Sequence, residues 1–197
     1  KRPLASNEYY PTFNLPHVEL VTTPLERLTA QGVVTRDGRL REVDCVIAAT
    51  GFRVDRYLSA LAVTGRDGRS IGDAWQDGAH AYLGITTHGF PNLFMLYGPN
   101  TNNGSILEML ERQVAYTVRH LLTVQQRGLR WLDVREEVEA AYDRALQQDI
   151  AKVDVWQAAC GHYYSAASGR IVTQWPHDMA EYARRTARDD MDAYRVG

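Results

Sequence analysis

One unit of the sequence constrains the fold most: an apolar run, a polar turn and a long amphipathic helix follow one another. The run Leu93–Tyr97 is apolar on both faces, which is typical of a buried strand, and Gly98-Pro99 ends it. Ser105, with Glu108 three residues later, forms a capping box that predicts a helix start. Apolar residues then recur every three or four positions, at Leu107, Leu110, Val114, Val118 and Leu121. This order predicts the α/β class, with α+β as the alternative.

The remaining elements are shorter. Cys45–Ala49 is a second apolar run and predicts a second buried strand, and His17–Thr22 alternates as a short strand does. Asp37-Gly38 predicts a hairpin over residues 32–43, and Asp67-Gly68 predicts a smaller hairpin or loop. Gly128 is expected to end the long helix. A second helix is predicted over residues 134–153, capped by Asp133, and a charged surface helix over residues 178–192.

Composition excludes several classes of protein. The 197 residues are 45% hydrophobic and 23% charged, which is typical of a globular chain. A net charge of −2 argues against a nucleic-acid-binding protein, and no apolar run is long enough to span a membrane. Two cysteines cannot build a disulfide scaffold, and the scattered histidines predict no metal site. Because position 1 is Lys rather than Met, we expect that the beginning of the gene product is missing.

The polar turn between the buried run and the helix is the candidate site. In open α/β sheets, ligands bind at the carboxyl end of a strand, facing a helix N-terminus. Asn100–Ser105 occupy that position, and the free N–H groups of the first helical turn attract an anion or an electron-rich carbonyl. An ordinary strand-to-helix turn is the alternative. The chain holds no Gly-x-Gly-x-x-Gly, no P-loop and no hydrolase elbow.

Taken in order, the motifs of the chain resemble the C-terminal part of class B flavoprotein monooxygenases, and most of all a Baeyer–Villiger monooxygenase. The residues that carry the resemblance are Lys1-Arg2-Pro3, Tyr9-Tyr10, Phe13-Asn14, Val18–Val21, Ala48–Phe52, Tyr82–Gly84, Gly89–Phe94, Gly98–Asn100, Tyr163-Tyr164, Gly169-Arg170, Trp175-Pro176 and Glu181–Arg185. Each motif alone is weak, whereas their order and spacing are specific, and they cover almost the whole chain.

The resemblance implies the C-terminal portion of a flavoprotein with two dinucleotide-binding domains, small antiparallel hairpins and C-terminal helices. Residues 1–104 would be the remainder of the NADP- and FAD-binding domains, residues 105–155 a helical part and residues 156–197 a tail. It also implies FAD, NADPH and O2, and a reaction that inserts one oxygen atom into a ketone, with the protein orienting the cofactors.

The resemblance assigns roles to individual residues. Arg2 matches the active-site arginine, whose guanidinium stabilises negative charge, and Lys1 matches a lysine that contacts the 2′-phosphate of NADPH. Trp175 would belong to a mobile element over the NADPH site. The residues expected near FAD are Thr50, Gly51 and Phe52 in one segment, and Gly98, Asn100, Thr101, Asn102, Asn103 and Ser105 in the other.

The family's two dinucleotide-binding fingerprints are absent from this sequence. We therefore expect a fragment that is inactive alone, and that self-associates or pairs with the missing N-terminal half. An N- or S-oxidising flavin monooxygenase is an alternative, as is a non-catalytic stand-alone module that assembles with a separate FAD-binding half. A cytoplasmic location is expected.

Overall fold

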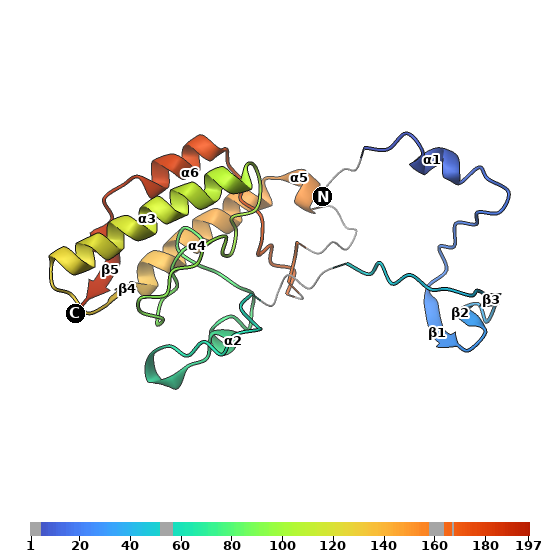
Figure 1. Cartoon of the computed structure of the whole chain (residues 1–197), viewed down its shortest axis with the longest axis horizontal. Helices are drawn as coiled ribbons and strands as arrows, with labels where there is room; N and C mark the ends of the chain where they lie inside the picture. The colour runs from blue at the N-terminus through green and yellow to red at the C-terminus, as the bar shows by residue number, and fades with distance from the viewer. Residues whose placement is uncertain (1–4, 52–56, 158–163, 167) are drawn as a thin grey trace. The chain divides into compact units, whose positions relative to one another are not determined.

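The computed structural model describes residues 5–51, 57–157, 164–166 and 168–197. The chain divides after Gly51 into two compact units, residues 2–51 and residues 52–197. Figure 1 labels their helices and strands. The division at residues 104 and 155 stays a prediction.

The unit of residues 2–51 is built around a three-stranded antiparallel sheet in the order β1-β2-β3. Its elements are α1 (Tyr9–Thr12), β1 (Leu25–Thr29), β2 (Gly32–Thr35) and β3 (Leu40–Glu42). The hairpin predicted over residues 32–43 is β2–β3. Asp37 holds its turn, since its carboxylate accepts from the Thr35 hydroxyl at 2.6 Å and from the Arg39 N–H at 3.2 Å.

The predicted strands outside this sheet are wrong. Neither residues 17–22 nor residues 45–49 form a strand, and the Ile47 side chain is 86% exposed. A strand that is apolar on both faces needs a neighbouring strand on each side and cover above and below. Among the described residues of this unit, none supplies such neighbours to Cys45–Ala49, because β3 pairs only with β2.

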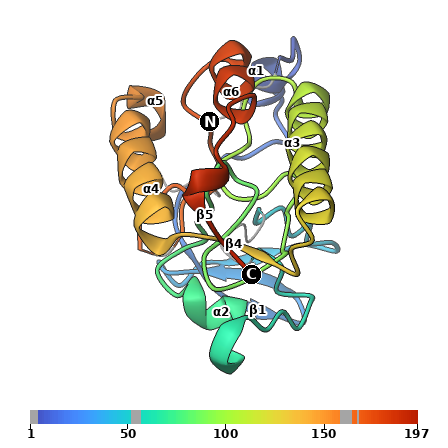
Figure 2. The same cartoon turned by 90° about the vertical axis from the view of Figure 1, so that its left-hand side faces the viewer.

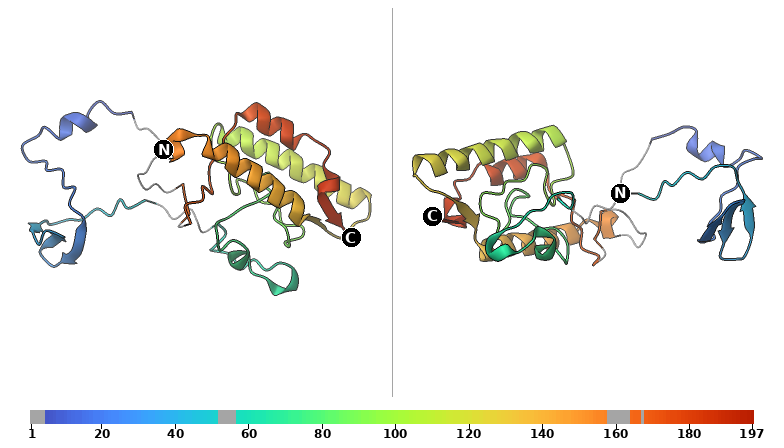
Figure 3. Two further views of the ribbon diagram at one scale, coloured as in Figure 1. Left: turned by 180° about the vertical axis from the view of Figure 1, so that it is seen from behind. Right: turned by 60° about the horizontal axis from the view of Figure 1, so that its bottom comes forward.

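The unit of residues 52–197 is mainly helical. Its elements are η1 (Arg66–Gly68), α2 (Ile71–Ala74), α3 (Ile106–Gln126), β4 (Leu132–Val134), α4 (Glu136–Ala151), α5 (Asp154–Gln157), α6 (Met179–Thr186), η2 (Met191–Ala193) and β5 (Tyr194–Val196). The three longest helices, α3, α4 and α6, have roughly aligned axes (Figures 1 and 3), and β4 and β5 pair antiparallel. Figure 2 looks between α3 and α4, with α6 and the loops of residues 81–105 lying between them. Within the described residues, no helix has the length and apolarity to cross a membrane.

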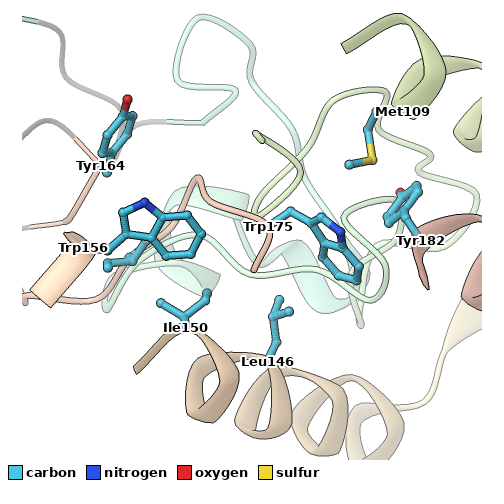
Figure 4. Packing of buried hydrophobic residues seen from close by; sticks show 8 residues of the cluster. Met109, Leu146, Ile150, Trp156, Tyr164, Trp175 and Tyr182 are labelled. Atoms are coloured by element: carbon cyan, nitrogen blue, oxygen red, sulfur yellow. The ribbon is translucent and has the colours of Figure 1, made fainter. Parts of the chain in front are cut away.

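A cluster of aromatic and aliphatic side chains joins these helices (Figure 4). Its members are Met109, Leu146, Ile150, Trp156, Tyr164, Ile171, Trp175 and Tyr182. Trp175 is 0% exposed, and its indole N–H donates to the Asp178 carbonyl at 3.1 Å. In this conformation Trp175 is part of the packed core. That it belongs to a mobile element over the NADPH site stays a prediction.

Helix α3 starts and ends where the sequence predicts. The Ser105 hydroxyl accepts from the Glu108 N–H at 3.3 Å, and Gly128 follows the last turn with φ +62°. The helix does not bury its predicted apolar stripe, however. The buried positions are Met109, Gln113, Tyr116 and His120, whereas Leu107 is 75% exposed and Val114, Val118 and Leu121 are also exposed.

Two further helix predictions need correction. Asp133 does not cap α4, because it lies in β4, where its carboxylate accepts from the Gly89 N–H at 2.9 Å. The helix begins three residues later, at Glu136. Pairing of β4 with β5 satisfies more backbone groups than a cap would, so it overrides the local signal. The helix predicted over residues 178–192 ends early, at Thr186.

Candidate functional site

The candidate site is the turn of residues 97–105, between an extended apolar segment and α3. Leu93–Tyr97 is not a strand of a sheet, which corrects the prediction, and it is only partly buried. Its backbone pairs instead with a loop and with a side chain. The Met95 N–H donates to the Ile85 carbonyl at 2.7 Å, and the Tyr97 N–H donates to Gln113 Oε1 at 2.6 Å.

The backbone of this turn is strained. Tyr97 (φ +61°), Asn100 (φ +57°) and Asn103 (φ +152°) all have positive φ, which is uncommon for residues other than glycine. Gly98 is required for a different reason, because a Cβ there would lie 2.3 Å from the carbonyl oxygen of Gly84. Three non-glycine residues with positive φ within seven positions indicate that the surrounding contacts, rather than local preference, hold this turn.

The asparagine side chains of the turn bind the C-terminal part of the chain. The Asn100 amide donates to the carbonyls of Ile171 (2.8 Å) and Gln174 (3.1 Å). Asn102 Nδ2 donates to Gln174 Oε1 at 2.8 Å, and Asn103 Nδ2 donates to the Trp175 carbonyl at 3.1 Å. The side-chain N–H groups named here are therefore engaged by the protein itself.

Backbone hydrogen bonds join the same two segments. The N–H groups of Asn100 and Asn102 donate to the carbonyls of Val172 (2.9 Å) and Thr173 (2.8 Å), and the Trp175 N–H donates to the Asn102 carbonyl at 2.9 Å. Asn102 and Gln174 form a parallel bridge. Residues 171–175 thus contact the candidate site, and sequence reasoning had singled out only Trp175 among them. The β-branched residues Ile171-Val-Thr173 were a local signal of extended backbone.

What the turn can offer a ligand is backbone, together with the start of α3. The first N–H groups of a helix lack intrahelical partners, and the aligned peptide dipoles place partial positive charge there. The Ser105 hydroxyl takes up one of these groups, that of Glu108, and Ser105 itself is exposed. The Thr101 hydroxyl is buried and donates to the Gly98 carbonyl at 2.7 Å, so it stabilises the turn from inside.

The other predicted site residues are not among the described residues of the unit that holds this turn. Lys1, Arg2 and Phe52 lie outside the described residues. Thr50 and Gly51 are exposed in the unit of residues 2–51, and Gly51 has φ +88°. Among the described residues no group of histidine, cysteine, aspartate or glutamate could hold a metal ion.

A second polar cluster in the same unit surrounds Asp190. Its carboxylate accepts from the Tyr116 hydroxyl at 2.7 Å and from the Tyr82 hydroxyl at 3.1 Å, and it lies 3.2 Å from His120 Nε2. Burial acts to raise the pKa of Asp190, but His120 and the two tyrosine hydroxyls outweigh it, so the pKa lies below its usual value. This cluster ties η2 and β5 to α3.

Comparisons of the sequence and of the structure with known proteins both find monooxygenases. No protein-family model matches the chain. A Baeyer–Villiger monooxygenase of Pseudomonas aeruginosa is 38% identical over 200 residues, which are 100% of this chain and 38% of that protein. The FAD-binding monooxygenase ktnD of Aspergillus niger is 36% identical over 194 residues, 95% of this chain and 32% of that protein.

Among solved structures, cyclohexanone monooxygenase from Rhodococcus sp. Phi1 bound to NADP+ superposes with a TM-score of 0.84 at 30% identity, over 100% of this chain and 39% of that one. The chain thus spans less than two fifths of the relatives it matches. Over almost its whole length, the chain is thus similar to part of proteins named Baeyer–Villiger monooxygenase, FAD-binding monooxygenase and cyclohexanone monooxygenase.

Proposed function

We propose that this chain forms the C-terminal part of an FAD- and NADPH-dependent monooxygenase that inserts one oxygen atom from O2 into a ketone. The observation that carries the proposal is the turn of residues 97–105, a strained backbone fixed by its own side chains at the N-terminus of a 21-residue helix. Such an arrangement suits the electron-rich edge of a flavin ring, because the first turn of α3 places partial positive charge at its N-terminus.

Bound FAD and NADPH would supply the redox chemistry. Residues of the turn, from Gly98 to Ser105, would orient the ring and stabilise negative charge on it. Thr50, Gly51 and Phe52 would also contact FAD. Lys1 would bind the 2′-phosphate of NADPH as a point charge. Arg2 would be the catalytic residue, because a guanidinium stays protonated and can stabilise the charge that develops on the ketone oxygen.

The exposed face of α3 supports the pairing of this chain with a nucleotide-binding half. Exposed or half-exposed apolar residues follow one side of the helix along its length: Ile106, Leu107, Leu110, Val114, Val118, Leu121 and Leu122. A continuous apolar face of this kind marks an interaction surface. In the relatives, more than 60% of the length lies outside the part that matches this chain. We propose that the corresponding nucleotide-binding half covers this face of α3.

The test uses the 197-residue chain and the product of the complete reading frame. We expect the longer product to bind FAD and to oxidise NADPH with formation of an ester or lactone from a ketone. The chain alone should bind FAD weakly and turn over no ketone. Stoichiometric FAD and NADPH oxidation by the chain alone would contradict the fragment interpretation. A complete reading frame without a dinucleotide-binding fingerprint would contradict a single-chain enzyme and favour a stand-alone module that assembles with a separate FAD-binding half.

Product analysis separates this function from its alternatives. If the longer product oxidises nitrogen or sulfur and forms no ester, the proposed substrate class changes from a ketone to an amine or a thioether. Arg2→Ala in the longer product should abolish ketone oxygenation while NADPH still reduces the flavin. Ketone turnover by that variant would disprove the role proposed for Arg2. A cytoplasmic location stays a prediction that fractionation of the source cells would test.

A further inference from the structure

A chain of hydrogen bonds, some partly and some fully buried, runs behind the turn of residues 97–105. It links five side chains and one carbonyl, in the order Gln174, Asn102, Tyr97, Gln113, Tyr182 and Leu83. Gln174 Oε1 accepts from Asn102 at 2.8 Å, and Asn102 Oδ1 accepts from the Tyr97 hydroxyl at 2.7 Å.

The chain continues into the helices. Gln113 Oε1 accepts from the Tyr97 N–H at 2.6 Å, and Gln113 Nε2 donates to the Tyr182 hydroxyl at 3.0 Å. That hydroxyl donates in turn to the Leu83 carbonyl at 2.7 Å. The chain therefore anchors the turn to α3 through Gln113, to α6 through Tyr182 and to the C-terminal segment through Gln174.

These bonds lie where the backbone is strained. Gln113 is 0% exposed and Gln174 is buried, whereas their partners Tyr97 and Asn102 are partly buried. Loss of either glutamine would leave a partly buried polar group without that hydrogen bond. Two of the linked residues are Tyr97, with φ +61°, and Asn102, which lies between the positive-φ residues Asn100 and Asn103. Strained backbone persists only when surrounding contacts over-determine it, and such strain is typical of ligand clamps.

We propose that Gln174 and Gln113 are positioning residues. Through Asn102 and Tyr97 they hold the turn in its strained form, so that its backbone and the start of α3 meet the FAD ring already in the binding geometry. This inference rests on the proposed function for the identity of the ligand. Preorganisation of this kind strengthens binding because ordering of the turn is completed before the ligand arrives.

The first arm of the test needs no cofactor. Gln174→Leu in the 197-residue chain removes the acceptor for Asn102 at nearly constant size, and Gln174→Glu retains an acceptor at the same length. We expect amide hydrogen exchange in residues 98–104 to accelerate about tenfold in Gln174→Leu, the loss of about one hydrogen bond. Gln174→Glu should restore slow exchange, and exchange in α4 should not change.

Asn92 provides a matched control. It too has positive φ, +61°, and it links two loops, since its amide donates to the Arg130 carbonyl and its oxygen accepts from the Leu132 N–H, both at 3.1 Å. Asn92→Ala should lower the melting temperature without changing exchange in residues 98–104. Asn102→Ala, in contrast, should reproduce Gln174→Leu, and it serves if Gln174→Leu fails to fold.

The second arm uses the complete reading frame loaded with FAD. We expect Gln174→Leu to raise the Kd for FAD about tenfold and to shift the absorption bands of the bound flavin, with Asn92→Ala unchanged in both. Wild-type exchange at the turn in Gln174→Leu and Asn102→Ala would overturn the inference. A loosened turn with a wild-type Kd and spectrum would overturn it as well. If the wild-type protein binds no FAD, the proposed function itself fails, and the exchange arm still decides whether these bonds hold the turn.

Discussion

Two regions of the chain share a sequence pattern and differ in structure. Cys45–Gly51 and Leu93–Gly98 are each an apolar run followed by a glycine turn. The backbone of the second region is fixed by hydrogen bonds to Ile85 and Gln113. The first is exposed throughout, and among the described residues of its unit no sheet strand pairs with it. The comparison shows that an apolar run indicates which residues would be stabilised by burial. Whether they are buried depends on contacts with residues far away in the sequence.

The largest difference between the regions is expected at their glycines. In Gly98→Ala the new Cβ would lie 2.3 Å from the backbone oxygen of Gly84, and backbone cannot move aside cheaply. We expect a loss of at least ~3 kcal/mol of unfolding free energy, measured by denaturant titration. Gly51→Ala is the control, because no atom lies within 4 Å of the added Cβ. Its positive φ of +88° is the expected source of strain, and should lower the unfolding free energy by about 1 kcal/mol. Equal losses would contradict the comparison.

The next largest difference is expected when an apolar side chain of each run is truncated to alanine and the losses of unfolding free energy are compared. Met95→Ala removes a buried side chain from the cluster around Trp75 and Phe90, and should cost ~3 kcal/mol through lost contacts and a cavity. Ile47→Ala removes a side chain that is already 86% exposed, and should cost less than ~0.5 kcal/mol. Thermal unfolding monitored by near-ultraviolet circular dichroism would give both values. A cost above ~2 kcal/mol for Ile47→Ala would mean that the first run is covered in solution.

Acid should destabilise the unit of residues 52–197 through Asp190. Because its folded-state pKa lies below the unfolded value, its carboxylate contributes stability above the unfolded pKa, and that contribution is lost as pH falls through the folded pKa. We expect wild-type unfolding free energy to fall by ~1–2 kcal/mol more than that of Asp190→Asn between pH 6 and about pH 3. Parallel pH profiles for the two proteins would show that Asp190 does not carry this dependence.

The smallest effect on stability, and a clear one on association, is expected on the outer face of α3. Leu107→Ser should change the unfolding free energy by less than ~0.5 kcal/mol, since the side chain is 75% exposed. The same change should reduce self-association of the 197-residue chain, because it interrupts the apolar face. Light scattering at several concentrations measures this, with the charged-face change Arg112→Ser as control. Identical scattering from Leu107→Ser and wild type would remove α3 from the interface.

The local predictions that succeeded depend on residues close in sequence. Ser105 caps α3 through a contact three residues away, Gly128 ends the helix, and Asp37 closes its hairpin within two residues. The buried-strand predictions failed because a strand is completed by partners elsewhere in the chain. The burial of α3 was predicted on the wrong side for a related reason: the inner face uses Gln113, Tyr116 and His120. Gln113 binds Tyr182 of α6, and Tyr116 and His120 lie against Asp190.

In the candidate site, too, some features could be predicted from residues close in sequence and others could not. The sequence was sufficient to single out Asn100–Ser105, to predict the helix that follows and, through the order of its motifs, to indicate the family that the relatives then supported. Only the tertiary structure showed that Asn100 and Asn102 bind residues 171–174, more than 70 positions away. A side-chain amide is satisfied by whichever carbonyl the fold brings within about 3 Å, and sequence spacing carries no record of that distance.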